Sequence, residues 1–196
     1  MATLRPFRDY DEKDVLNLYS LYTGGSPALD SGMDLSTWAK KVPSGTMVKL
    51  HTGWDVSQEL EMLGDAGDAS AALNNVTTQR YGVKAKVFPT EAGEQPLGML
   101  LHHVASYDEN GEQLKFNPRK AAELEACLPG QAVPLVRKGM FLLNGVGGTP
   151  AAGGEIYAGD NGGLSATDAG SDKQVGIALG AASDGNTLIL LHIGGW

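Results

Sequence analysis

The carboxyl-terminal forty residues constrain the fold more than any other part of the chain. Between Gly153 and Ile193, short apolar runs alternate with turn clusters rich in Gly, Asp, Asn and Ser. The runs are Glu155–Ala158, Gln174–Leu179 and Thr187–Ile193. Asn and Gly adopt a positive φ at little cost, so residues 160–163 and 183–186 should turn the chain tightly. Strands joined by such turns predict a small antiparallel β-barrel or sandwich.

Strand-like patterns also occur earlier in the chain, and they extend the β prediction to most of its length. They cover residues 45–51, 77–88, 96–106 and 132–143, the last interrupted at Lys138-Gly139. The sequence therefore predicts a mainly β protein, with small antiparallel barrel or sandwich modules, an N-terminal arm and one or two short helices. The expected segments are an arm, short helix and loop (1–44), a β-rich region (45–131) and a C-terminal small β-barrel (132–196).

Two short helices are expected from capping signals and periodicity. Residues 1–8 should form an extended arm, because Pro6 opposes helix. Asp9 can then cap a helix over Asp11–Tyr22, whose apolar residues recur at three- and four-residue spacing. A second helix should lie near 118–128, where Asn117 is suited to the N-cap and Pro118 to the first helical position. The sequence Pro129-Gly130 should end it.

Charge and hydropathy narrow the class of protein. The 196 residues carry a formal net charge of −8, and each local basic spot, such as Arg137-Lys138, is a single pair of charges. A nucleic-acid partner is not expected, since phosphate neutralisation requires a basic face. The N-terminus lacks the apolar core of a signal peptide, and no apolar run reaches membrane-spanning length. We therefore expect no membrane partner, and synthesis in a cytoplasm.

Signals for catalysis, cofactors and metals are weak throughout the sequence. The glycine-rich stretch Gly145–Gly154 departs from a dinucleotide fingerprint at Pro150 and leads into a strand. His102 and His103 are adjacent in an expected strand, so they should point to opposite faces. Cys127, the single cysteine, lies in an apolar stretch and is expected to pack as a small hydrophobe. We accordingly predict no catalytic, cofactor-binding or metal site.

The C-terminal third carries a series of short β-motifs: a Gly-bounded strand containing Ile156-Tyr157, a polar hairpin from Asp160 to Thr167, the run Gln174–Leu179, and a closing apolar strand, Leu188–Ile193. This pattern resembles the C-terminal barrel of tailed-bacteriophage head decoration (capsid cement) proteins. The resemblance implies a protein that binds the outside of an icosahedral shell, often as a trimer. It would bridge neighbouring major capsid subunits and help the shell to resist internal pressure.

The resulting hypothesis is a non-enzymatic virion protein on the outer capsid surface, made in the host cytoplasm, needing no cofactor. Its expected partners are the major capsid protein and further copies of itself, most simply as a homotrimer. The N-terminal arm, the first helix, the loop around Trp38 and the glycine-rich loop supply the contact candidates. These are Leu4, Phe7, Leu18, Tyr19, Tyr22, Trp38, Val146 and Pro150.

Two other functions remain compatible with the sequence. One is a tail or fibre adaptor with receptor or glycan binding, suggested by the aromatic residues of the N-terminal quarter. The other is a small β-barrel enzyme of hydrolase or cupin-like type, which would need histidines and carboxylates to converge on one barrel face. Copy number per particle separates decoration from tail proteins. Replacement of His51, His102 and His192, with a metal assay, would reveal an enzyme.

Overall fold

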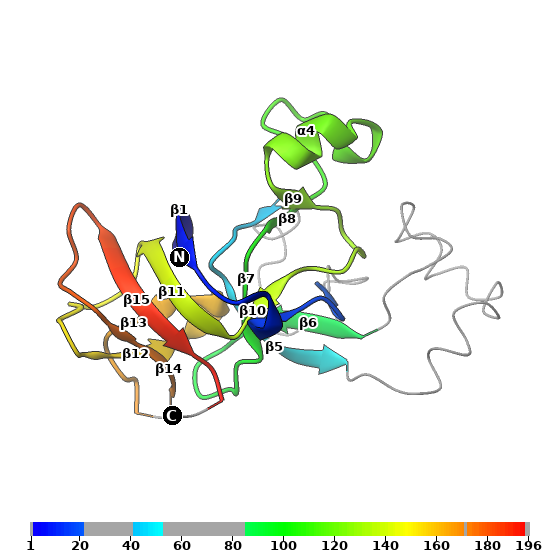
Figure 1. Cartoon of the computed structure of the whole chain (residues 1–196). Coiled ribbons are helices and arrows are strands. Elements are labelled where there is room, and N and C mark those ends of the chain that lie inside the picture. Colours follow the sequence, from blue (N-terminus) through cyan, green and yellow to red (C-terminus); the bar gives the residue numbers. More distant parts are fainter. Residues whose placement is uncertain (1, 22–40, 53–84, 171, 195–196) are drawn as a thin grey trace.

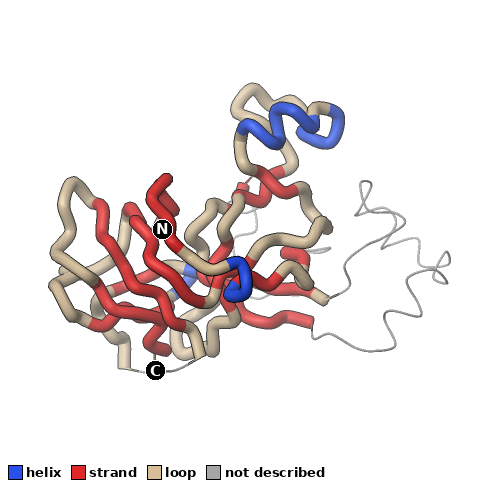
Figure 2. The backbone as a smooth tube through the Cα atoms, viewed as in Figure 1, coloured by secondary structure: helices blue, strands red, loops and turns tan. Residues whose placement is uncertain are grey.

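The computed structural model describes residues 2–21, 41–52, 85–170 and 172–194. Strands make up 45% of the structure and helical segments 11%, which confirms the mainly β prediction (Figure 2). The helical segments of the described residues are all short. They are α4 (Pro118–Glu123) and the 3-10 turns η1 (Glu12–Asp14), η2 (Leu114–Phe116) and η3 (Asp160–Gly162).

The first sheet is a curled, antiparallel half-barrel of six strands, seen at the left of Figure 1. In spatial order its strands are β1 (Thr3–Asp9), β11 (Lys138–Asn144), β15 (Asn186–His192), β14 (Lys173–Ala178), β12 (Glu155–Ala158) and β13 (Leu164–Ser165). Five of these strands come from the C-terminal third. The barrel-like fold expected there is thus present, with the N-terminal strand added at its edge.

Two further sheets are built from shorter strands that are distant in sequence. The second sheet has the order β2 (Val15–Leu16), β10 (Leu135–Val136), β7 (Gly98–Leu100), β5 (Met47–Thr52), β6 (Lys86–Pro89) and β3 (Ser20–Leu21). The third contains β4 (Lys41–Val42), β8 (His103–Ala105) and β9 (Ala126–Cys127). Two pairs, β3 with β6 and β8 with β9, are parallel.

The second sheet separates two hydrophobic clusters, because alternate residues of its strands point to opposite sides. Met47 and Met99 pack with the inner face of the first sheet, whereas their neighbours Val48 and Leu100 pack in the second cluster. All four side chains are fully buried. The first cluster therefore joins the two sheets like the core of a sandwich.

The tight turns expected in the C-terminal third are confirmed. Asp184 and Gly185 have φ angles of 49° and 73°, and they connect β14 to β15 with Ser183 bridged to Asn186. Asn161 has a φ of 55° within η3, inside the predicted turn at 160–163. Positive φ at successive residues is the geometry that matches the twist of antiparallel strands. Local turn chemistry thus favours the antiparallel pairing of β14 with β15.

The N-terminal prediction is wrong in two respects. Within the expected arm 1–8, the residues of β1 are extended as expected, but they do not form a free arm, because β1 is hydrogen-bonded to β11. The helix expected over Asp11–Tyr22 is absent from its described part, where η1 is followed by β2 and β3. Val15 packs on the first cluster and Leu16 on the second. Neighbouring residues that face opposite sides require strand geometry, and this burial overrides the helical periodicity.

Two expected strands are broken by crossings between sheets. The run 96–106 becomes β7 and β8, separated by a bend at Leu101 and His102. The run 132–143 becomes β10 and β11, separated at Arg137 rather than at Lys138-Gly139. The backbone N–H of Arg137 donates to Asp14 at 2.9 Å, and its carbonyl accepts from Ile193 at 2.9 Å. Each break lets one run serve two sheets.

The second expected helix is present but shorter than predicted. Asn117 caps α4 by accepting a hydrogen bond from the Lys120 N–H, and Pro118 occupies the first turn, as the sequence indicated. The helix ends at Glu123, and Cys127 lies in strand β9 with a half-buried side chain. Burial raises the pKa of the Cys127 thiol. Residues 106–125 project from the third sheet at the top of Figure 1, and we call them the lobe.

The predicted segments 1–44, 45–131 and 132–196 share one core. Strand β1 belongs to the first sheet with the C-terminal strands, and Met47 and Met99 belong to the first hydrophobic cluster. The boundaries between the segments stay a prediction. The strand expected over 77–88 falls within the described residues only at its end, where β6 begins at Lys86.

Candidate interaction surface

Six large aliphatic side chains form a contiguous block on the solvent side of the first sheet, and we call this block the outer apolar face. They come from the central strands β11, β15 and β14 and from the residue after β14. The members are Met140, Leu142, Leu188, Leu190, Ile177 and Leu179.

The strand register places these side chains in two rows. Leu190 pairs with Met140 on one side and with Ile177 on the other, which gives one row across three strands. Leu188 pairs with Leu142, and its carbonyl accepts a 2.8 Å hydrogen bond from the Leu179 N–H, which gives the second row. Side chains at directly opposite positions lie within contact distance of each other. The two rows therefore form one surface.

The outer apolar face is accessible, in contrast to the inner face of the same strands. Phe141, Leu143, Ile189 and Leu191 alternate with its members and are fully buried. The six outer side chains are all partly exposed, and Leu179 is 41% exposed. None of the six is among the side chains that form or pack against the core clusters of the described residues.

This arrangement departs from the usual pattern of a sheet with one wet face. Such a sheet alternates apolar and polar residues, whereas continuous apolar runs are typical of strands covered on both sides. In β15, Leu188 to Leu191 are apolar at four successive positions. Contiguous exposed apolar surface of this kind marks sites of association. Its burial would contribute roughly 25 cal/mol for each Å² removed from water.

Polar and charged residues lie at both ends of the block and on its β12 side. Lys138 pairs with His192 at one end of the strands, and Asn144 pairs with Asn186 at the other. Glu155 lies opposite Ile177 on the β12 side. The Tyr157 hydroxyl donates to the Glu155 carboxylate, which raises the pKa of Tyr157 to about 12. An apolar centre within a polar rim is the anatomy of a protein–protein interface.

The lobe carries a second, smaller set of exposed aromatic side chains. Phe116 is 78% exposed and Tyr107 is 44% exposed. The Lys115 ammonium lies 4.7 Å from the centre of the Phe116 ring. The lobe also contains two ion pairs, with Lys120 2.8 Å from Glu109 and Arg119 3.2 Å from Glu123. These aromatics are interspersed with charges, so the lobe does not match the first sheet as an apolar surface.

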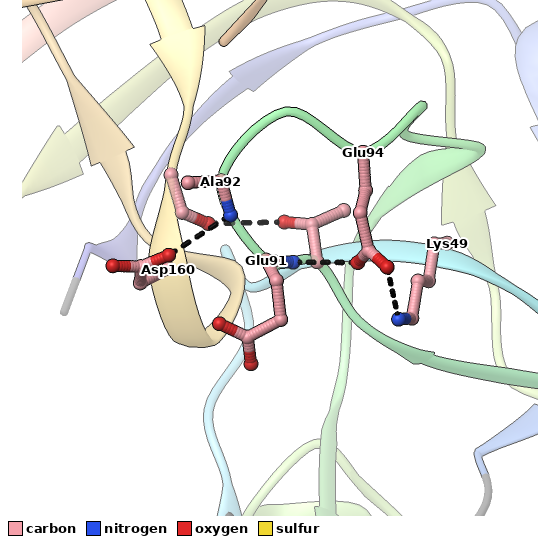
Figure 3. Close-up of polar contacts among 7 residues, drawn as sticks. Lys49, Glu91, Ala92, Glu94 and Asp160 are labelled. Atoms are coloured by element: carbon pink, nitrogen blue, oxygen red, sulfur yellow. Dashed lines mark hydrogen bonds and ion pairs between the residues drawn. The ribbon is translucent and has the colours of Figure 1, made fainter. Parts of the chain in front are cut away.

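A cluster of carboxylates joins the first sheet to the second, and its contacts identify it as structural (Figure 3). The Asp160 carboxylate accepts from the Ala92 N–H at 2.9 Å. Glu94 accepts from the Glu91 N–H at 2.9 Å and from the Lys49 ammonium at 2.6 Å. Although burial favours the neutral acid, these two hydrogen bonds lower the pKa of Glu94. Burial and the nearby Asp160 raise the pKa of Glu91.

The same junction is packed tightly around Gly162 in η3. Its N–H donates to the Thr90 carbonyl at 2.8 Å. A Cβ at this position would lie 2.3 Å from Thr46 Cγ2 and 2.6 Å from the Met47 carbonyl oxygen. The tip of the C-terminal hairpin is thus held against the second sheet.

The structure distributes the contact residues predicted from the sequence over different environments. Phe7 and Leu18 are 51% and 53% exposed, on β1 and in the connection between β2 and β3. Leu4 is only 9% exposed and belongs to the first cluster, on which the half-buried Val146 also packs. Partner contact through Leu4 would require β1 to move.

Two further predicted residues, Tyr19 and Pro150, do not extend an exposed surface. Tyr19 is half-buried against the second cluster, and Pro150 is buried. Tyr22 and Trp38 lie outside the described residues. Of the six predicted residues that the structure describes, Leu4 and Val146 share one hydrophobic cluster, Leu4 as a member and Val146 packed against it. The contact roles of all eight stay predictions.

Sequence reasoning missed the outer apolar face, although its signal was present. The segments 140–143 and 188–191 contain successive apolar residues where a one-faced strand would alternate. Such runs indicate burial on both sides. The pattern alone could not say which residues would point outward, because that requires the register with neighbouring strands.

Comparisons with known proteins found no matching family model, curated protein or solved structure. Among the described residues, no group of three or more His, Cys, Asp and Glu side chains is placed to hold a metal ion. No helix in the described ranges is long and apolar enough to cross a membrane.

Proposed function

We propose that this chain is a non-enzymatic structural virion protein that binds the outer surface of a phage capsid. It stabilises the shell by bridging neighbouring major capsid subunits. The observation that carries the proposal is the outer apolar face, six aliphatic side chains in two registered rows on a six-stranded sheet. The resemblance of the C-terminal sequence to capsid decoration proteins supports the same assignment.

In physical terms, the proposal requires a protein that does not aggregate non-specifically before it meets the shell. A net charge of −8 opposes non-specific self-association in solution. The charged groups next to the outer apolar face lie at its rim, so docking need not bury an unpaired charge there. Repetition over many equivalent sites turns a modest interface into a large total stabilisation of the shell.

Binding to expanded shells tests the proposal. Purified protein is mixed with shells that lack it, and the bound fraction is measured by co-sedimentation. We expect Leu190→Asp to weaken binding at least about tenfold, since it places a charge at the centre of the interface. Phe116→Asp on the lobe is the matched control, because it places the same charge at an exposed apolar side chain away from the outer apolar face, and it should bind like the natural protein. Equal binding by both variants, or no binding of the natural protein to any shell, would contradict the proposal.

Particle imaging separates the proposal from the main alternative. Cryo-microscopy of virions should place hundreds of copies on the shell lattice. A handful of copies at a vertex or tail would instead favour a tail or fibre adaptor. Analytical ultracentrifugation of the free protein tests the homotrimer that forms part of the proposal, in which the loop Gly145–Gly154 contacts a sister subunit.

A further inference from the structure

His103 lies where β1, the third sheet and the lobe meet. It is the first residue of β8, and its Nδ1 accepts a 2.9 Å hydrogen bond from the backbone N–H of Ser44. The Ser44 carbonyl in turn accepts from the Leu4 N–H at 3.1 Å. Ser44 is 5% exposed, so its N–H has little access to water. Two hydrogen bonds in series thus connect β8 to β1.

A second connection runs beside the first and uses the base of the lobe. The Glu125 carbonyl accepts from the His103 N–H at 3.1 Å. The Glu125 carboxylate pairs with Arg8 of β1 at 2.8 Å. Glu125 has a φ of 47°, an uncommon conformation for a residue with a side chain. The lobe is therefore attached to β1 through Glu125, next to the hydrogen bonds of His103.

Charges from each neighbouring element act on the His103 ring. Lys41 on β4 and Arg8 on β1 are cationic, and His102 adjoins it on its own strand. Among the described residues, Glu125 is the acidic group that acts on it, and that carboxylate already binds Arg8. Burial first, and then Lys41, lowers the pKa of His103. The surroundings favour the neutral ring.

Protonation would abolish the hydrogen bond of His103. A protonated imidazole carries a hydrogen on both nitrogens and has no acceptor left. The new N–H at Nδ1 would face the N–H of Ser44, and the buried Ser44 donor would be left without an acceptor. The added charge would also lie near Lys41 and Arg8. The hydrogen bond from the Ser44 N–H to the His103 ring can therefore form only while the ring is neutral.

We propose that His103 is a proton-operated latch that holds the β4–β5 connection, and through it β1, when neutral and releases them when protonated. Because the folded-state pKa lies below that of the unfolded chain, the latch is fully stabilising above about pH 6.5 and is lost as the pH falls through the folded pKa. The inference does not depend on the proposed function.

Hydrogen exchange of the natural protein and two variants tests the latch. Exchange of the Ser44 and Leu4 amides, corrected for intrinsic rates, is compared at about pH 7.5 and about pH 5. We expect protection to fall about tenfold or more in the natural protein. His103→Asn keeps an acceptor at the Nδ1 position and cannot be protonated, so its protection should change by less than about twofold. His102→Asn should behave like the natural protein.

A direct titration covers the case in which His103→Asn does not fold. Nitrogen-15 NMR of the natural protein should show a His103 ring with the proton on Nε2 at neutral pH. The Ser44 amide signal should shift with the same apparent pKa, below about 6.5. Titration of His103 at or above that value, or a Ser44 amide that does not follow it, would overturn the latch. Equal pH sensitivity of the natural protein and His103→Asn would do the same.

Discussion

The first and second sheets have the same number of strands but are assembled in different ways. In the first sheet, five of the six strands lie within the last sixty residues, and the pairs β12 with β13 and β14 with β15 are each consecutive in the chain. In the second, β2 pairs with β10 and β3 pairs in parallel with β6, across long stretches of chain. Local pairing can be read from turn chemistry, whereas distant pairing depends on burial that the sequence shows only indirectly.

The first sheet also differs from the second in how its two faces are used. Both faces of the second sheet pack in hydrophobic clusters. The first sheet packs its inner face in the same way, but its outer apolar face is exposed to solvent. The proposed function rests on this partly exposed surface, whose aliphatic composition is typical of a protein core.

The largest expected effect separates the two faces of β15. Leu191→Ala removes a fully buried side chain and should lower the free energy of unfolding by about 2–5 kcal/mol. Leu190→Ala, on the outer apolar face, should cost less than about 1 kcal/mol. Chemical denaturation of both variants measures the difference. Similar losses would mean that the outer apolar face is covered in the free protein.

The next effect tests the junction between the first and second sheets. Gly162→Ala places a Cβ against Thr46 and Met47 at a φ of 68°, and should cost about 2–4 kcal/mol. Gly153→Ala is the control, because Gly153 has a φ of 78° and nothing lies within 4 Å of the added Cβ. It should cost only about 1 kcal/mol. The melting temperatures of the two variants measure the difference. Equal melting temperatures would show that Gly162 is not tightly packed against the second sheet.

A smaller effect is expected in the lobe. Asn117→Ala removes the side chain that accepts from the Lys120 N–H, and should cost about 1 kcal/mol. Asn117→Asp keeps an acceptor and should retain most of the stability. Hydrogen exchange of the α4 amides reports the local change. Unchanged protection in Asn117→Ala would mean that lobe packing, rather than the cap, holds the helix.

The smallest effect concerns the ion pair between Lys49 and Glu94. The pKa of Glu94 is lowered in the folded state, so the pair stabilises the fold above about pH 4.5 and this contribution is lost as the pH falls through the lowered folded value. Lys49→Met should flatten this acid dependence and cost less than about 1 kcal/mol at neutral pH, because both side chains are partly solvated. Denaturation profiles between about pH 3 and about pH 7 measure it.

The predictable part of the fold was the part fixed by local chemistry. The strand at Glu155–Ala158 was expected with the same bounds, the turn at Asp184-Gly185 has the expected positive φ, and Asn117 caps α4. Each signal lies within a few residues of the structure that it specifies. These signals could therefore be interpreted without knowledge of distant contacts.

The errors arose where distant packing decides the local structure. Val15 belongs to an apparent helical stripe, yet Val15 and Leu16 pack in different clusters and lie in a strand. Arg137 interrupts an apolar run because its backbone bonds to Asp14 and Ile193 from two other parts of the chain. The outer apolar face was missed for the same reason, since only the register of β11, β15 and β14 brings its side chains together.

Both margins of the first sheet are closed to a further strand. At one margin β1 contains Pro6, which has no N–H to offer, and a bulge between Leu4 and Arg8, while the Leu4 N–H is already taken by Ser44. At the other margin the chain beyond β11 returns to bridge Gly147 to Ser165 of β13. Filament growth by strand templating is thus obstructed, a safeguard for any protein made at high concentration. Copies of this chain can then associate through their side-chain surfaces rather than by pairing strand edges.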